Sequence, residues 1–310
     1  MILIKKIEVT GFKGSGSLSW TLDPVVNILG GPNGSGKSTL FRLCHTLLTA
    51  DEISDNQFKA FSYIAKSVLI TLTNGWTVQW IGLGYGQHAK GAKENNLSAS
   101  NSRDVYDDTN TERPFADLKN ILSVFMINSF EQHVDKAATY LKQPNSVSLD
   151  DPTMMDLLIE DQIRMRNEDF SSTMELFAED PVGNENKRND YFQKYTQIYT
   201  VLAHFLVGYD EKFNSKFEFV KQGNKFGYER LSMGEKQILL LLLMVVNAKG
   251  LPCVFFMDEP DLSMHIDWKE ILVTELHHLN PQMQIILSTH APSVITGWMD
   301  HVKEMSQLLK

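Results

Sequence analysis

A glycine-rich segment of the sequence has the residue types and spacing needed to hold a chain of phosphates. Residues 31–38 read Gly-Pro-Asn-Gly-Ser-Gly-Lys-Ser, which fits the pattern G-x-x-x-x-G-K-[ST]. In such a loop the glycines let backbone N–H groups wrap the phosphates, the lysine reaches the β- and γ-phosphates, and the last hydroxyl binds Mg²⁺. The residues expected to bind nucleotide here are Asn33, Gly34, Ser35, Gly36, Lys37, Ser38 and Thr39, with Ser38 also a magnesium ligand.

Two adjacent acids, Asp258 and Glu259, end an apolar run that starts at Pro252. A strand buried on both faces tolerates acids only at its carboxyl end, where open α/β sheets bind ligands. We expect Asp258 to hold Mg²⁺ directly or through water, and Glu259 to polarise the attacking water. Alone, this pair could equally be two exposed acids in a turn. The phosphate loop elsewhere in the sequence favours the catalytic interpretation.

Two further segments carry groups that suit anion chemistry. Ser232 and Gly234 begin a leucine-rich helix, where a hydroxyl and free N–H groups could form a second anion site. An ordinary helix cap, with Glu235 in the first turn, explains the same residues equally well. His290 closes another apolar run at 283–287 and could sense or donate to a γ-phosphate, although a histidine in a loop is commonly structural.

The elements that must position these residues can be read from periodicity and turn signals. The first ninety residues predict strands and one helix, with a hairpin around Asn74-Gly75. Residues 82–113 are rich in Gly, Asn, Ser and charge and predict a long surface loop. The elements predicted in this half are strands at 2–9, 25–29, 67–73, 76–81 and 121–127, and a helix at 37–48.

The middle of the chain is acidic and predicts a pair of helices. Between residues 141 and 190 there are 12 acidic and 5 basic residues, which gives −7 of the net charge of −9. Asp151-Pro152 predicts a helix start, and Pro181 to Asn184 predicts the break between the two helices. The second helix should bury a stripe formed by Tyr191, Tyr195, Ile198, Leu202 and Phe205.

The last third predicts a hairpin, a buried helix and two central strands. The hairpin turns at Gln222-Gly223-Asn224, and the helix at 234–248 is apolar nearly all round. Short apolar runs at 252–257 and 283–287 are typical of central parallel strands.

Composition excludes several classes of protein. With 310 residues, 43% hydrophobic and 22% charged, the chain is not disordered, collagen-like or a simple coiled coil. A net charge of −9 does not indicate a nucleic-acid coat, although a local basic groove is left open. The two distant cysteines suit a reducing compartment. No apolar run approaches the roughly 20 residues needed to span a bilayer. We therefore expect a cytoplasmic protein without a membrane partner.

The order of these segments resembles the ABC-type ATPase head shared by transporters, SMC and RecF proteins. More closely, residues 257–268 (Met-Asp-Glu-Pro-Asp-Leu-Ser-Met-His-Ile-Asp-Trp) and 288–292 (Ser-Thr-His-Ala-Pro) resemble the AAA-family ABC ATPases of bacterial anti-phage systems. PARIS, Septu, some retron modules and the related OLD family are examples. The resemblance covers about residues 1–50 and 230–300.

The resemblance implies an α/β fold, an ABC-ATPase head with a mixed β-sheet core and an inserted helical hairpin. The division that it implies is 1–140 and 211–310 for the two parts of the head and 141–210 for the insertion. ATP and Mg²⁺ are the implied cofactors. Ser232, Gly234 and Glu235 would form a signature turn that acts on the nucleotide of a second subunit. The other implied site residues are Asp261 across that interface, His290 as the switch histidine and Lys13 at the α-phosphate or base.

Two features depart from the pattern of the family. Met233 stands where the family usually has glycine. A Q-loop glutamine is not obvious, and Gln79 and Gln132 are the candidates.

The function implied is that of an ATPase, forming ADP and phosphate, which dimerises head to head around ATP or assembles further. The sequence ends about twenty residues after His290, which leaves no room for the nuclease of OLD proteins. We therefore expect it to control a separate nuclease or toxin in anti-phage defence. A DNA-repair or SMC/RecF-like ATPase is the alternative, and a transporter subunit is disfavoured by the long spacing between Lys37 and Ser232. The acidic helices could be a docking surface for a partner or a solvated lid.

Overall fold

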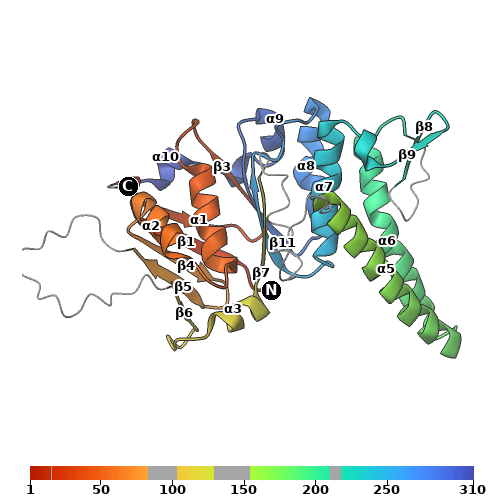
Figure 1. Cartoon of the computed structure of the whole chain (residues 1–310), viewed down its shortest axis with the longest axis horizontal. Helices are drawn as coiled ribbons and strands as arrows, with labels where there is room; N and C mark the ends of the chain where they lie inside the picture. The colour runs from red at the N-terminus through yellow and green to blue at the C-terminus, as the bar shows by residue number, and fades with distance from the viewer. Residues whose placement is uncertain (15, 83–102, 129–153, 210–217) are drawn as a thin grey trace, which may run out of the picture. The chain divides into compact units, whose positions relative to one another are not determined.

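The computed structural model describes residues 1–14, 16–82, 103–128, 154–209 and 218–310, which fall into two compact units (Figure 1). The sheet unit comprises residues 1–128, 252–260 and 282–310, and the helical unit comprises 129–251 and 261–281. The boundaries expected at 140 and 210 lie in segments outside the described residues. The three-part division of the chain therefore stays a prediction.

The first sheet of the sheet unit is antiparallel and has the strand order β2-β1-β4-β5-β6. Buried and half-buried residues alternate along β4, as expected of a strand with one face on the core. The predicted hairpin is confirmed, since Ser67 pairs with Ile81 and the turn glycine Gly75 has a φ of 90°. The strands are β1 (Ile4–Phe12), β2 (Gly16–Thr21), β4 (Ser67–Leu72), β5 (Thr77–Ile81) and β6 (Arg103–Tyr106).

The second sheet is parallel and has the order β12-β3-β11-β10-β7. Every residue of β3, β10 and β11 is buried, which confirms the central strands predicted from the apolar runs. The expected mixed core is thus realised as one antiparallel and one parallel sheet. The strands are β3 (Val26–Gly30), β7 (Ser123–Asn128), β10 (Cys253–Asp258), β11 (Met283–Ser288) and β12 (Val302–Glu304).

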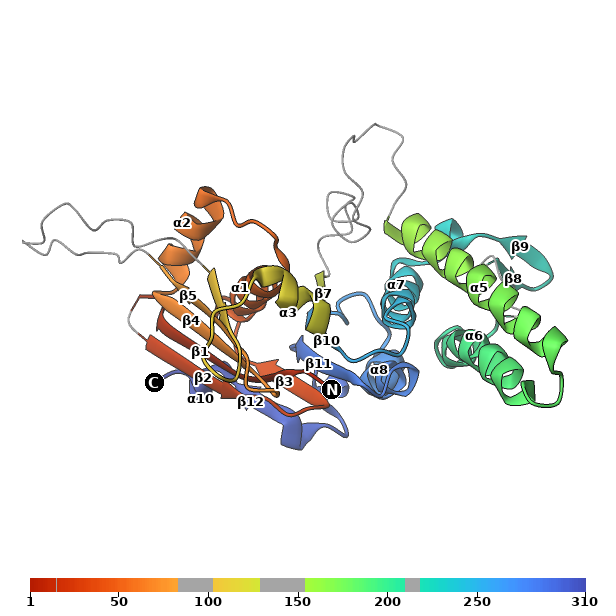
Figure 2. The same ribbon diagram turned by 90° about the horizontal axis from the view of Figure 1, so that it is seen from below.

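The helix α1 (Lys37–Thr49) lies between the two sheets, in contact with β5 on one side and with β7 and β10 on the other (Figure 2). Its ring at Phe41 packs between Trp20 and Phe256, with centroids 6.5 Å and 5.5 Å apart. Shorter helices complete the unit. They are α2 (Asp55–Ile64), α3 (Phe115–Ile121), α9 (Pro292–Ile295) and α10 (Met305–Leu308).

The expectation of a single helix in the first ninety residues is wrong, because α2 follows α1. It begins with a capping box, in which Ser54 N–H donates to Gln57 Oε1 at 3.0 Å and Gln57 N–H donates to Ser54 Oγ at 3.3 Å. Its apolar face places Phe58 and Phe61 on Trp80. The serine and glutamine three residues apart were a readable start signal.

Part of the surface loop expected at 82–113 is a strand, β6. Its first residue, Arg103, hydrogen-bonds to carbonyls at the C-terminal end of α1. Arg103 donates to the carbonyls of Leu47 at 3.2 Å and Ala50 at 2.5 Å, and its guanidinium stacks on Phe115. A cation at a helix C-terminus satisfies carbonyls that have no partner within the helix. Burial lowers the pKa of this arginine to about 10, with the opposing effect of Asp51.

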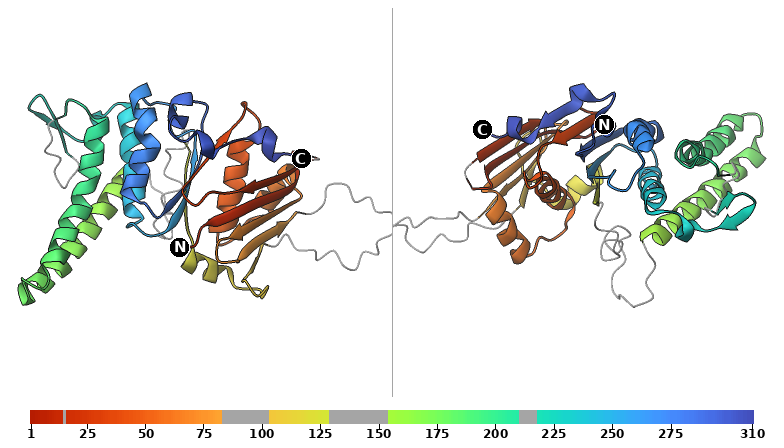
Figure 3. Two further views of the ribbon diagram at one scale, coloured as in Figure 1. Left: turned by 180° about the vertical axis from the view of Figure 1, so that it is seen from behind. Right: turned by 90° about the horizontal axis from the view of Figure 1, so that it is seen from above.

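The helical unit is built from α5 (Met154–Glu179), α6 (Glu185–Phe205), α7 (Met233–Asn247) and α8 (Ile266–Leu279). Figure 3 shows α5 and α6 side by side, joined at the predicted break, and the stripe predicted on α6 is buried. The predicted helix start at Asp151-Pro152 lies outside the described residues. Residues 238–245 of α7 are all buried, which confirms a helix apolar on every side.

A short ribbon completes the helical unit and confirms the hairpin predicted around Gln222-Gly223-Asn224. It pairs β8 (Phe219–Lys221) with β9 (Asn224–Phe226), and Tyr228–Arg230 form a 3₁₀ turn. Of the helices in the described ranges, none combines the length and apolar character that a bilayer crossing requires.

One buried glutamine ties the two sheets of the sheet unit together. Gln284 on β11 accepts from the N–H of Ile4 at 3.0 Å and donates to the carbonyl of the same residue at 2.8 Å. Its amide also donates to the carbonyl of Asp23 at 2.8 Å. Gln284 is fully buried and bonds both backbone groups of Ile4, whereas the carbonyl of Asp23 also accepts from Asn27 Nδ2 at 2.8 Å.

Replacing this glutamine by leucine, Gln284→Leu, should therefore destabilise the sheet unit. Buried backbone groups left without partners cost about 1–3 kcal/mol each, so we expect a loss of about 3 kcal/mol in the free energy of unfolding. Urea unfolding measures the loss. The matched change at an exposed position of α6, Gln193→Leu, should have an effect below about 0.5 kcal/mol. Equal stability of the two variants would contradict the role of the amide.

Candidate functional site

The phosphate loop is a backbone structure that only glycine can form at several positions. Gly31, Gly34 and Gly36 have φ values of 136°, 75° and 107°, in the region that side chains disfavour. A Cβ on Gly36 would lie 2.8 Å from Phe12 Cζ and from Lys13 Cε. The helix α1 starts directly after Gly36 without a side-chain cap. Its first N–H groups are therefore open to an anion.

Lys37 is buried at the start of α1 and already bonded to its own loop. Its Nζ donates to the carbonyl of Gly31 at 2.7 Å and to that of Pro32 at 3.3 Å. It also lies 2.9 Å from Nε2 of His290, so the structure brings these two predicted residues together. Burial lowers the pKa of Lys37, and the nearby carboxylates of Glu259, Asp258 and Glu304 oppose that shift.

The carboxylate of Asp258 is the point where β10, β11 and α1 meet. Its Oδ1 accepts a hydrogen bond from Ser38 Oγ at 3.0 Å and another from Ser288 Oγ at 2.7 Å. Asp258 pairs with Ser288 across the parallel sheet, and only 4% of the aspartate is exposed. Sequence reasoning missed Ser288 as a partner. The available signal was that both residues close apolar strands of equal length.

Glu259 leaves the strand in a left-handed conformation with a φ of 49°. Its N–H donates to the carbonyl of Ser288 at 3.0 Å, which turns the chain away from the sheet. Its Oε1 then lies 3.4 Å from Nε2 of His290, and its side chain is 25% exposed. Because Nε2 carries either a proton or a lone pair, it can donate to Glu259 or accept from Lys37, but not both.

Lys13 lies against the same loop, while its contact with the α-phosphate or base of a nucleotide stays a prediction. Its Nζ donates to the carbonyl of Gly34, and its backbone N–H donates to Ile64 at 2.7 Å, with a φ of 50°. A second neighbour, Glu304, was missed by the sequence. Its carboxylate lies where a Cβ on Gly30 would come within 2.4 Å of Oε1. The phosphate loop therefore has the carboxylate of Glu304 beside it as well as the ammonium groups of Lys13 and Lys37.

The donors present at this site fit a nucleotide and Mg²⁺. Ser35 Oγ is enclosed and has no hydrogen-bond partner among the described residues, so a phosphate oxygen would satisfy it. The oxygens of Ser38 and Asp258 suit Mg²⁺, which binds one or two protein oxygens together with substrate phosphates. Within the described part of the chain, no group of three or more His, Cys, Asp or Glu could hold a metal alone.

The signature turn, residues Leu231–Glu235, belongs to the helical unit. Ser232 caps α7, and Glu235 completes a capping box by accepting from Ser232 N–H at 2.7 Å. The ordinary cap is thus confirmed, while anion binding at this turn stays a prediction. A Cβ on Gly234 would lie 2.4 Å from the carbonyl oxygen of Ser263, which explains the glycine.

Asp261 begins the turn that packs on Gly234, and its side chain is committed to a lysine. Its Oδ2 lies 3.0 Å from Nζ of Lys269, and the aspartate is 5% exposed. A contact from Asp261 to a second subunit therefore stays a prediction. Gln79 lies in the middle of β5, and Gln132 lies outside the described residues, so the Q-loop glutamine also stays unassigned.

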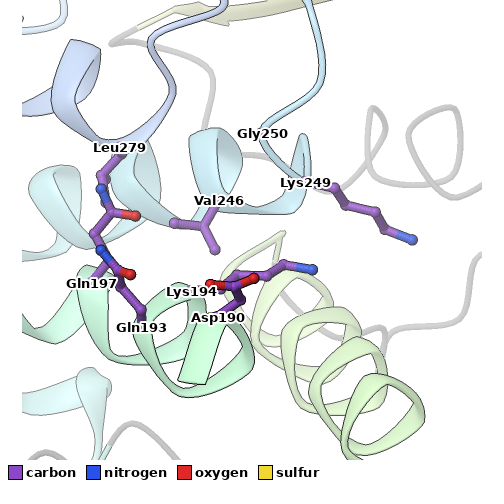
Figure 4. A pocket seen from close by; sticks show the side chains of 8 residues that line it. All are labelled: Asp190, Gln193, Lys194, Gln197, Val246, Lys249, Gly250 and Leu279. Atoms are coloured by element: carbon purple, nitrogen blue, oxygen red, sulfur yellow. The ribbon is translucent and has the colours of Figure 1, made fainter. Parts of the chain in front are cut away.

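The helical unit also contains a pocket of about 260 Å³ (Figure 4). Lys249 points away from the other lining side chains, and Lys194 is paired with Asp169 at 2.7 Å. The lining includes none of the residues predicted to bind or hydrolyse nucleotide. It is formed by Asp190, Gln193, Lys194, Gln197, Val246, Lys249, Gly250 and Leu279.

The fold and this loop are those of a P-loop domain of the AAA type. Residues 77–296 match the family described as "AAA domain, putative AbiEii toxin, Type IV TA system". The match covers more than half of the chain, and the chain belongs to this family.

One curated relative resembles part of this chain, and two solved structures resemble its fold. The chain is 34% identical over 89 residues to the "Retron Vc95 probable ATPase" of Vibrio cholerae, a match to 25% of this chain but only 17% of that protein. The fold is similar to the SMC head domain of Pyrococcus furiosus solved with ScpA, with a TM-score of 0.57, 13% identity and coverage of 98% and 93% of the two chains. For the SMC head domain of Thermotoga maritima the TM-score is 0.53, with 14% identity and coverage of 94% and 91%.

The buried ammonium of Lys37 generates a prediction about stability and pH. A lysine whose pKa is lowered in the folded state destabilises the protein below that pKa, and the loss disappears as pH rises to the ordinary value of 10.5. Methionine does not titrate, so the stability of the parent relative to Lys37→Met should rise between pH 7 and pH 10. Urea unfolding of both proteins at the two pH values measures this change. A difference in the free energy of unfolding that is independent of pH would contradict the lowered pKa.

Proposed function

We propose that this chain binds ATP with Mg²⁺, closes a head-to-head homodimer around it, and hydrolyses it to ADP and phosphate. The observation that supports this most is the convergence of Lys37, Ser38, Asp258, Glu259 and His290 at the carboxyl ends of β10 and β11. Phosphate binding, metal binding and water activation need these five groups in one place.

In the proposed mechanism each side chain has one task. Lys37 moves its hydrogen bonds from the carbonyls of Gly31 and Pro32 to the β- and γ-phosphates. Its ammonium group is then paired with negatively charged oxygens. Ser38 and Asp258 would hold Mg²⁺, which supplies neutralisation of phosphate charge. Glu259 takes the proton of the water whose oxygen bonds to the γ-phosphorus as the bond to ADP breaks. His290 holds Glu259 in position through Nε2.

The base assignment is tested by Glu259→Gln, which keeps shape but cannot accept the proton. We expect ATP to bind as before, hydrolysis to slow by about 10²-fold or more, and an ATP-bound dimer to accumulate. Phosphate release and size-exclusion chromatography with ATP and Mg²⁺ measure the two effects. Glu8→Gln, at a surface ion pair of β1, is the control. Normal hydrolysis by Glu259→Gln would exclude Glu259 as the base.

Dimerisation is supported by exposed apolar side chains beside the signature turn. Met233, Leu262 and Ile266 are 57%, 50% and 59% exposed. In the sequence, Met233 and Leu262 are next to Gly234 and Ser263, which are in contact, and Ile266 follows three residues after Ser263. We infer that a second copy covers them when ATP is bound, since apolar side chains grouped at one place favour an interface.

Ile266→Asp tests this surface without disturbing the fold, because aspartate is favourable at the first position of a helix. In the Glu259→Gln background we expect at least tenfold weaker ATP-dependent dimerisation, since a carboxylate would be buried at the interface. Analytical ultracentrifugation with ATP measures it. Val182→Asp places the same charge at another exposed aliphatic position of the helical unit and should leave the dimer intact. Equal dimerisation of both variants would remove this surface from the interface.

We further propose a role in anti-phage defence, in which ATP-driven closure or hydrolysis controls a separate nuclease or toxin. The family description and the similarity to the retron ATPase support it. Co-purification with the product of the neighbouring gene, with and without ATP, tests it. The alternative, a head that binds DNA, is less favoured because the net charge of the chain is −9. In addition, α5 exposes acidic side chains, such as Glu168, Glu175 and Glu179, which would repel the phosphates of DNA.

A further inference from the structure

Tyr209 holds the first turn of α7 from outside the helix. It lies beyond the end of α6, and its hydroxyl donates to Glu235 Oε1 at 2.7 Å. The other oxygen of the same carboxylate, Oε2, accepts from the N–H of Ser232 at 2.7 Å. Burial alone would raise the pKa of Glu235, but the hydrogen bonds from Tyr209 and Ser232 lower it below its ordinary value. The carboxylate is thus ionised and bonded on both sides.

The ring of Tyr209 is held in turn by the β8–β9 ribbon. Phe219 and Phe226 meet it edge to face, with centroids 6.2 Å and 6.0 Å away, and stack on each other at 6.3 Å. Lys221 Nζ lies 4.5 Å from the centroid of the same ring. Phe219 is fully buried, although the ribbon has only three residue pairs. Because an isolated ribbon of this size is unstable, these ring contacts must maintain it.

These contacts form one connection from the ribbon to the signature turn. The ribbon fixes the ring of Tyr209, the hydroxyl fixes Glu235, and Glu235 fixes the N–H of Ser232. A hydrogen bond to a charged carboxylate is stronger than a neutral one, so loss of the hydroxyl releases one side of Glu235.

We propose that Tyr209 is a positioning residue for the signature turn, set by the β8–β9 ribbon through its ring. In this proposal Tyr209 acts on the signature turn through Glu235. It keeps Glu235 and Ser232 in the arrangement that meets the ATP of a second copy. This inference rests on the proposed function, in which the signature turn of one copy acts on the nucleotide of the other.

The experiment uses Tyr209→Phe in the full chain carrying Glu259→Gln. Phenylalanine keeps the ring contacts and removes only the hydroxyl. We expect the protein concentration for half-maximal ATP-dependent dimerisation to rise about tenfold. Binding of a fluorescent ATP analogue to dilute monomer, which reports the phosphate loop alone, should be unchanged. The matched control is Tyr195→Phe in α6. It removes a hydroxyl that donates to Asp169 of α5 at 2.5 Å.

A double variant separates positioning from a general loss of stability. If Tyr209 acts through the signature turn, Tyr209→Phe should add little to the weakening of the dimer already caused by Ser232→Ala. Fully additive effects, or an equal loss of dimer in Tyr195→Phe, would overturn the inference. If the parent and the Tyr209→Phe variant dimerise equally well with ATP, the inference about Tyr209 is overturned and the proposed dimer stands. A parent that stays monomeric with ATP would overturn the proposed dimer and this inference together.

Discussion

One buried carboxylate organises the sheet unit. Asp258 ends a strand in which all residues are buried, and a charge in such a place is tolerated only when hydrogen bonds replace water. The hydroxyls of Ser38 and Ser288 provide them, which fixes the start of α1 against the ends of β10 and β11. The same bonds constrain the loop before α1, because this loop connects β3 to the first turn of the helix. The positions of Lys37 and His290 follow from that arrangement.

The parts predicted well from the sequence depend on neighbours in the chain. The runs that became β10 and β11 are continuously apolar, and the glycine pattern of the phosphate loop needs no distant residue to be recognised. The order of motifs also predicted that Lys37, Asp258 and His290 belong to one site. At Ser232 two interpretations were equal, because a helix cap and an anion site use the same atoms. The structure realises the cap, with Glu235 as its second member.

The parts that were missed depend on residues distant in the sequence. Arg103 lies in a polar stretch, and its role exists only because the end of α1 lies beside β6. β12 has three residues, too few for a pattern, and it brings Glu304 to Gly30 by pairing with β3. Gln284 resembled any polar residue near a strand start, and its function needs the backbone of Ile4 from the other sheet. The missed helix α2 did have a local signal, the pair Ser54 and Gln57.

The left-handed backbone at Glu259 has a consequence for stability. A non-glycine residue at a φ of 49° costs the fold of order 1 kcal/mol or more, and glycine or asparagine at the same place would relieve it. The strained backbone thus lies directly beside the contact between Glu259 and His290. Under the proposed function, an asparagine at this position would relieve the strain but remove the base, so greater stability would come with lost hydrolysis.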